Sequence, residues 1–132
     1  MIRNVIFDVG NVFVRWSPAI VVERAFGAPA GSKENAALVG RIFGEAWLDL
    51  NRGLMAMAEA MEKIAAAGRF SADEIGRVNH HITDHLIAID GTEALARRIK
   101  AAGYRTFALT DNVHEIVAHL KGRHTFWPLF ED

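Results

Sequence analysis

The chain has 132 residues, of which 51% are hydrophobic and 23% are charged. These values exclude a disordered chain and fit one globular domain of ordinary size. Its 15 basic and 16 acidic side chains nearly balance, so no basic field predicts binding to nucleic acid or to an anionic membrane. The lack of cysteine excludes disulfides and thiolate zinc sites. We see neither a signal peptide nor an apolar run of about 18 residues, and therefore expect a cytoplasmic protein.

The first apolar run, residues 5–7, is predicted to be a strand buried on both faces, as in parallel sheets that helices cover. It ends at a carboxylate, Asp8. Gly10 and Asn11 follow, and both residue types tolerate unusual backbone angles. Ligands of open α/β sheets bind at the carboxyl ends of the strands. Asp8 is therefore a candidate functional residue, although an aspartate before a Gly-Asn pair is also a common turn former.

Residues 17–87 are predicted to form a block of helices with no strand among them. Ser17 and Pro18 have the form of an N-cap and a first helical residue. Ser71 and Glu74 have the spacing of a capping box. The expected helices cover residues 18–26, 33–50, 54–67 and 72–87, and Gly40 and Gly44 weaken the second of them.

Residues 90–132 return to an alternation of helix, strand and helix. The strand ends at a second polar cluster, Thr110, Asp111 and Asn112, which on its own is typical of a helix N-cap. The two strands then form a parallel unit whose crossover contains the helical block as an insertion. The expected elements are a helix over residues 93–102, a strand over 105–109 and a helix over 113–120.

Two motifs, FDVGNV at residues 7–12 and FALTDN at residues 107–112, resemble the first and second motifs of the haloacid dehalogenase (HAD)-like hydrolase superfamily. The Asp-x-Gly-Asn-Val form of the first motif is similar to the branch that includes glucose-1-phosphate phosphatases. The resemblance implies an α/β fold, with a HAD-like Rossmannoid core whose parallel sheet is incomplete here. It places the core at residues 1–15 and 90–132 and an inserted all-helical cap at residues 16–89.

The resemblance also implies a Mg²⁺-dependent phosphatase that acts on a small phosphorylated metabolite. Asp8 would attack phosphorus and form an aspartyl-phosphate, a known form of carboxylate nucleophilic catalysis. Mg²⁺, which prefers oxygen ligands, would be held by Asp8 and by the main-chain carbonyl of Gly10. The phosphoryl group would lie where free helix amides attract an anion. The expected substrate-binding residues are Thr110, Asp111, Asn112 and Asn11.

Departures from the family pattern leave other functions open. Gly10 stands where the family has a second aspartate, its usual general acid. Neither the family's later lysine nor its later acidic residues are recognisable, because Lys121 follows the second motif too closely and Glu131 and Asp132 lack a strand to present them. We therefore expect a chain shortened at its C-terminus. One alternative is a truncated or degenerate relative that serves as a non-catalytic binding module. Another is a haloacid dehalogenase, which uses the same aspartate without the metal.

Two parallel strands form a sheet too small to stand alone, because each strand needs neighbours for its backbone hydrogen bonds. We therefore expect homo-oligomers that associate through the open sheet edge and the apolar tail at residues 126–130.

Three histidines, His80, His81 and His85, cluster on one predicted helix and suggest a metal site. No further ligand occurs at a fixed spacing, which favours a solvated helix face instead. Residues near the turns that would line the cap side of a pocket are Arg15, Trp16 and Arg52.

Overall fold

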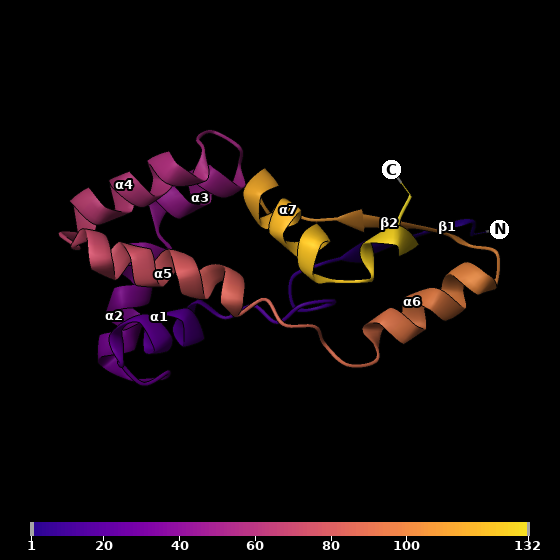
Figure 1. The fold of residues 1–132 in the computed structure, drawn as a ribbon, viewed down its shortest axis with the longest axis horizontal. Coiled ribbons are helices and arrows are strands. Elements are labelled where there is room, and N and C mark those ends of the chain that lie inside the picture. Colours follow the sequence, from indigo (N-terminus) through magenta and orange to yellow (C-terminus); the bar gives the residue numbers. More distant parts are fainter. Residues whose placement is uncertain (1, 132) are drawn as a thin grey trace.

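The structure is a computed structural model that describes residues 2–131. Helices α1 to α5 gather at one end of the molecule, and strands β1 and β2 lie with helix α6 at the other (Figure 1). Helix α7 lies between these two groups. The elements are β1 (Asn4–Asp8), α1 (Pro18–Phe26), α2 (Lys33–Ile42), α3 (Glu45–Asn51), α4 (Met57–Gly68), α5 (Ala72–Asp84), α6 (Thr92–Ala101), β2 (Arg105–Leu109), α7 (His114–Arg123) and the 3-10 helix η1 (Trp127–Leu129).

The two strands pair in parallel, in a register that runs from Asn4 beside Arg105 to Asp8 beside Leu109. Successive side chains of a strand point to opposite faces of its sheet. One face is covered, and Thr106 on it is fully buried. The other face is open, since Ile6 is 64% exposed and Leu109 is 68% exposed. The predicted burial on both faces is therefore wrong for the described residues, because only one layer packs against this sheet.

Aromatic side chains fill the space under the covered face. The ring of Phe13 lies 5.4 Å from that of Phe7, 4.7 Å from Phe126 and 5.2 Å from Phe130. Phe126 is 1% exposed, and the backbone amide of Glu131 donates to the Thr106 carbonyl at 2.8 Å. The tail was expected to take part in association between chains, and this stays a prediction. It packs into the core of its own chain and covers part of the outer edge of β2.

Local capping signals set several helix ends where the sequence predicts them. The Ser17 hydroxyl accepts the Ile20 amide at 3.4 Å, and Gly27 ends α1 in the left-handed conformation with φ 75°. The capping box is also formed. The Ser71 amide donates to the Glu74 carboxylate at 2.7 Å, and the Glu74 amide donates to the Ser71 hydroxyl at 3.2 Å. These ends were predictable because each depends on residues within one helical turn.

Other helix boundaries differ from the prediction, and α7 ends at Arg123, three residues later than expected. The expected helix over residues 33–50 is two helices, α2 and α3, with a break at Phe43 and Gly44. A Cβ atom at Gly44 would lie 2.9 Å from the Gly40 carbonyl oxygen, so this bend requires glycine. Helix α4 begins at Met57, three residues later than expected, and α5 ends at Asp84, three residues earlier.

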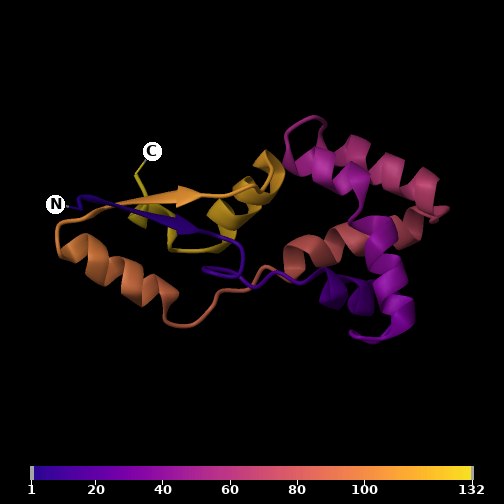
Figure 2. The ribbon, with the colours of Figure 1, turned by 180° about the vertical axis from the view of Figure 1, so that it is seen from behind.

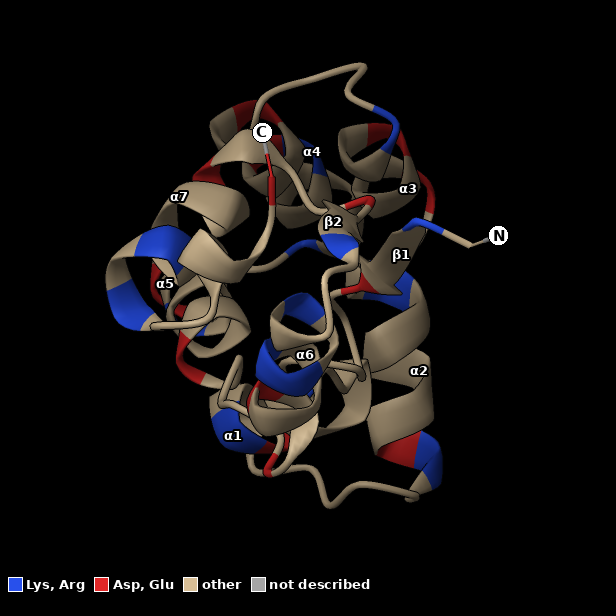
Figure 3. Ribbon diagram, turned by 90° about the vertical axis from the view of Figure 1, so that its right-hand side faces the viewer, with Lys and Arg blue, Asp and Glu red and all other residues tan. Residues whose placement is uncertain are grey.

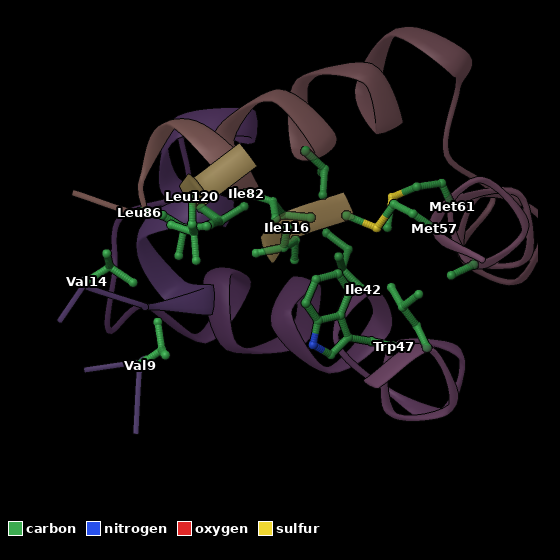
Figure 4. Close-up of a cluster of buried hydrophobic side chains, with 14 of the residues drawn as sticks. Val9, Val14, Ile42, Trp47, Met57, Met61, Ile82, Leu86, Ile116 and Leu120 are labelled. Atoms are coloured by element: carbon green, nitrogen blue, oxygen red, sulfur yellow. The ribbon is translucent and has the colours of Figure 1, made fainter. Parts of the chain in front are cut away.

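The main hydrophobic cluster joins the two groups of elements. Ile116 and Leu120 of α7 are almost completely buried, at 2% and 0% exposure. They lie in one cluster with Ile82 and Leu86 from the α5 region and with Met57 of α4 (Figure 4). Side chains of α7 share this buried cluster with those of the cap helices, and the boundaries predicted near residues 15 and 90 remain a proposal for dividing the chain.

Charged residues of both signs are interspersed over the helices, and neither sign dominates the side shown in Figure 3. Several form ion pairs along one helix, such as Lys63 with Glu59 at 2.9 Å and Arg97 with Glu93 at 2.6 Å. Among residues 2–131, no helix combines the length and the apolar character needed to span a membrane.

Candidate functional site

The two polar clusters of the sequence lie at the same edge of the sheet. Asp8 is the last residue of β1 and pairs with Leu109, the last residue of β2, and Thr110 follows directly. Asp8 is exposed at this edge. It opens onto a cavity of about 160 Å³ whose walls come from both strand ends and from the cap. The lining residues are Asp8, Gly10, Asn11, Trp16, Trp47, Asn51, Leu86, Asp111 and Asn112.

The loop after Asp8 is folded back on itself. The Val9 carbonyl accepts the amides of Phe13 at 2.9 Å and Val14 at 3.2 Å. Asn11 adopts the left-handed conformation with φ 56°, which asparagine tolerates better than most residues. Its side-chain oxygen accepts the Trp16 amide at 2.9 Å. Asn11 was predicted to bind substrate. In the structure its side-chain oxygen already accepts a hydrogen bond that holds the loop together.

The same loop is tied to the segment that returns from the cap. The Arg15 amide donates to the Ile87 carbonyl at 2.8 Å, and the Ile89 amide donates to the Phe13 carbonyl at 2.8 Å. The two connecting segments run side by side (Figure 2). The Asp8 loop and the link to the cap are thus one hydrogen-bonded unit, which no local sequence pattern indicated.

The Asp8 carboxylate has little to restrain it. One oxygen accepts the Val9 amide at 2.6 Å. Within residues 2–131, no lysine or arginine forms an ion pair with it. An exposed carboxylate with a free oxygen at a cavity wall is chemically able to act as a nucleophile or as a metal ligand.

Thr110 opens onto a neighbouring cavity of about 480 Å³ and does not line the cavity of Asp8. Its hydroxyl accepts the backbone amide of Asn112 at 3.2 Å and the Asn112 side-chain amide at 2.6 Å. The hydroxyl proton remains free to donate. The two cavities share Asn51, Asp111 and Asn112. Asp111 and Asn112 thus line the same cavity as Asp8, whereas Thr110 lines only the adjoining cavity.

The cap contributes an aromatic wall that the sequence indicated only in part. Trp16, which was expected near the pocket, stacks on Trp47 with ring centroids 5.7 Å apart and planes at 13°. Phe43 packs edge-on against both rings, at 5.7 Å and 5.1 Å. Trp47 and Asn51 lie four residues apart on α3 and so share a helix face, but no sequence pattern marks that face as a pocket wall. Arg52 lines the larger cavity, whereas Arg15 lines neither.

The residues around Asp8 include several oxygen ligands of the kind that a hard cation prefers. The carboxylates of Asp8 and Asp111 belong to residues of one cavity wall, and Gly10 adds a main-chain carbonyl. Mg²⁺ binds such oxygen ligands and completes its shell with water and with substrate phosphate. The residues of this cavity therefore fit the metal that the family resemblance implies.

The histidine cluster differs from the expected solvated helix face. His85 is only 6% exposed, and neither of its ring nitrogens has a hydrogen-bond partner. Burial lowers the pKa of His85 and of His81. His80, His81 and Asp84 bring possible metal-ligand atoms within 4.8 Å of one another. However, the Arg24 guanidinium forms an ion pair with the Asp84 carboxylate at 3.2 Å, and its positive charge opposes cation binding there.

Solved structures identify the architecture. No protein-family model and no curated protein matches the sequence. The magnesium-bound HAD-hydrolase YfnB from Bacillus subtilis aligns with a TM-score of 0.66 at 17% identity, over 99% of this chain. The chain has the HAD-like fold. A dehalogenase aligns with a TM-score of 0.63 at 17% identity, over 98% of the chain. L-2-haloacid dehalogenase from Xanthobacter autotrophicus, with chloropropionic acid covalently bound, aligns with a TM-score of 0.61 at 14% identity, over 99% of the chain.

The HAD-like α/β fold predicted from the two motifs is therefore confirmed. The chain spans 63%, 60% and 55% of the lengths of these three structures. Its likeness to the Asp-x-Gly-Asn-Val branch and its expected shortening remain predictions.

Proposed function

We propose that this HAD-like chain hydrolyses phosphate monoesters of a small metabolite, with Asp8 as the nucleophile. The observation that carries the proposal is the place of Asp8, an exposed carboxylate at the end of β1 on the wall of a cavity. Asp111 and Asn112 also line that cavity, and the start of α7, whose backbone amides not used within the helix attract anions, opens onto the adjoining cavity. An exposed carboxylate with a free oxygen can attack phosphorus to form an aspartyl-phosphate, and the adjoining helix start can attract the phosphoryl group.

In the first step, a carboxylate oxygen of Asp8 bonds to phosphorus while the bond from phosphorus to the ester oxygen breaks. The departing alkoxide takes a proton from water, because Gly10 offers no side-chain acid at the position that supplies one in the family. In the second step, a water oxygen bonds to phosphorus while the bond from phosphorus to the Asp8 oxygen breaks. Inorganic phosphate leaves, the Asp8 carboxylate is restored, and the released proton neutralises the hydroxide formed in the first step. Mg²⁺, when bound by Asp8 and the Gly10 carbonyl, would lessen the repulsion between the two anions.

Halide displacement from a small 2-haloacid is the second candidate. It is favoured by the apolar walls that Trp16, Trp47 and Leu86 give the cavity, and by the likeness to L-2-haloacid dehalogenase. Asp8 would attack carbon, expel the halide and form an ester, which water would hydrolyse to the hydroxy acid. This chemistry needs no metal, so dependence on Mg²⁺ separates the two reactions.

The test is turnover of a chromogenic aryl phosphate, a panel of sugar phosphates and 2-chloropropionate, each with Mg²⁺ and with EDTA. We expect phosphate release that requires Mg²⁺ and falls about a thousandfold or more in Asp8→Asn. Asp90→Asn removes an exposed aspartate outside the cavity and serves as the matched control. Turnover that survives Asp8→Asn would contradict the assigned nucleophile. Halide release in EDTA would favour the second candidate, and no turnover of any compound would favour a non-catalytic binding module.

A further inference from the structure

Two cavities meet at the candidate site, and one cap residue stands between them. The cavity of Asp8 has a volume of about 160 Å³, and the cavity of Thr110 has about 480 Å³. Of the residues that line both, Asp111 and Asn112 follow β2, whereas Asn51 ends cap helix α3. Asn51 is thus the cap's contribution to the wall that separates the two spaces.

The smaller cavity limits the size of a bound molecule. Its volume of about 160 Å³ is smaller than the usual range for ligand pockets of about 300–1,000 Å³. We expect such a space to favour a phosphoryl group with two or three carbons over a hexose phosphate. A larger leaving group would need the second cavity as well.

Asn51 is suited to keep the two spaces apart. Its side chain is half-buried, and Trp47 lies one turn earlier on α3 with only 7% exposure. Trp47 is stacked on Trp16, which fixes the wall behind Asn51. The side-chain amide offers both a donor and an acceptor to a polar group of the substrate.

We propose that Asn51 determines substrate size at this site and restricts the reaction to phosphate monoesters with two or three carbons. The inference rests on the proposed phosphatase function. Shortening Asn51 to alanine would join the two cavities and leave room for a longer leaving group beside Asp111.

The first experiment compares kcat/KM for phosphoglycolate and for glucose 6-phosphate. We expect the native chain to favour phosphoglycolate by about tenfold or more, since pocket contacts of this size discriminate by about 10- to 200-fold. In Asn51→Ala the preference should shrink several-fold, mainly through a lower KM for glucose 6-phosphate. Asn79→Ala removes an exposed asparagine of α5 outside both cavities and should leave the preference unchanged.

A second measurement tests the inference even if no substrate is turned over. Trp16 and Trp47 line the small cavity and Trp127 does not, so Trp127→Phe leaves fluorescence that reports on this site. In an Asp8→Asn background, phosphoglycolate should quench the emission more tightly than glucose 6-phosphate, and adding Asn51→Ala should remove most of the difference. Size selection in binding without turnover would overturn the catalytic proposal alone. Equal responses with and without Asn51, or no quenching by either compound, would overturn the assignment of Asn51.

Discussion

The helical end and the sheet end of this molecule differ in how completely each buries its apolar residues. In the helical end, the inner sides of the helices are fully buried, as at Val21, Leu50 and Val78, and Leu54, which is 68% exposed, lies in the loop after α3. In the sheet end, Ile6 and Leu109 are 64% and 68% exposed. An amphipathic helix has one apolar side to bury, whereas a parallel sheet needs a packing layer on each of its two faces. The comparison shows that a segment of this chain can complete helices from local sequence but cannot complete a sheet from two strands.

The candidate site combines one contribution from each end. Asp8 and Asp111 come from the strand ends, and Trp47 and Asn51 come from the cap. The loop between Asp8 and the cap is held by hydrogen bonds from Arg15 and to Phe13, as described above. The sheet end therefore supplies the reactive groups, and the helical end supplies the walls that select what reaches them.

The largest effect should come from breaking the packing under the sheet. Phe13 is 1% exposed and contacts aromatic rings of β1 and of the tail. Phe13→Ala should lower the free energy of unfolding by about 3–5 kcal/mol, because it leaves a cavity in a packed core. Leu109→Ala on the open face should cost at most about 0.5 kcal/mol. Urea unfolding of both variants provides the measurement. A Leu109→Ala cost close to that of Phe13→Ala would mean that the open face is covered in solution.

The open edge of β1 allows a direct test of the predicted self-association. Along a parallel strand, alternate residues direct their backbone groups to opposite edges. Arg3 accepts the Arg105 amide, so Asn4, Ile6 and Asp8 direct theirs to the outer edge. Ile6→Lys should weaken association by about tenfold or more, since lysine discourages pairing of edge strands. Leu54→Lys changes an equally exposed apolar residue of the helical end, at 68%, and should have no effect. A native chain that remains monomeric at micromolar concentration in analytical ultracentrifugation would contradict the prediction.

A smaller effect is expected from the best-defined local signal of the helical end. Ser71→Ala removes the hydroxyl that accepts the Glu74 amide at 3.2 Å. The loss of such an N-cap costs about 1 kcal/mol. Chemical denaturation should show this cost, and Ser71→Asp should recover most of the stability because aspartate also caps helices well. An unchanged midpoint in Ser71→Ala would mean that α5 is held by packing alone.

How far the fold follows from sequence depends on the range of the interactions involved. The Ser71 cap and the Gly27 helix end are interactions within one turn, and both were predicted at the correct residues. The two strands and their polar ends were also predictable, because short apolar runs stop at Asp8 and Thr110. The open sheet face, the inward packing of Phe126 and the other tail rings depend on which distant segments are available to cover the strands. No local pattern contains that information.

The site was predictable to a similar extent. Asp8 and Asp111 follow strand ends, and the rule that parallel strands converge at one edge was enough to bring them together. The placement of Thr110 on the adjoining cavity depends on how Asn112 turns toward the hydroxyl. The wall formed by Trp47 and Asn51 depends on how the cap sits over the sheet, which is a long-range property of the fold.

The last prediction concerns a buried group at the cap end of the connection between the two regions. His85 is 6% exposed, and its pKa is lowered from the ordinary value of 6.5 mainly by burial, with Arg24 and Arg15 adding to the effect and Asp84 opposing it. Below about pH 6.5 the unfolded chain therefore binds a proton at His85 that the folded chain does not. Stability should fall as the pH decreases from 6.5, until the lower folded pKa is reached.

His85→Gln should reduce the loss of folding stability below pH 6.5, whatever its effect on stability at neutral pH. Urea midpoints at pH 7.5, 6.5 and 5.5 give the slope for each variant, and His81 contributes to the native slope because its pKa is also lowered by burial. His114→Gln removes an exposed imidazole at the start of α7 and controls for the general effect of losing a histidine. If the slope of His85→Gln equals that of the native chain, His85 is protonated as readily in the folded chain as in the unfolded one. Burial of His85 would then not be a source of acid sensitivity.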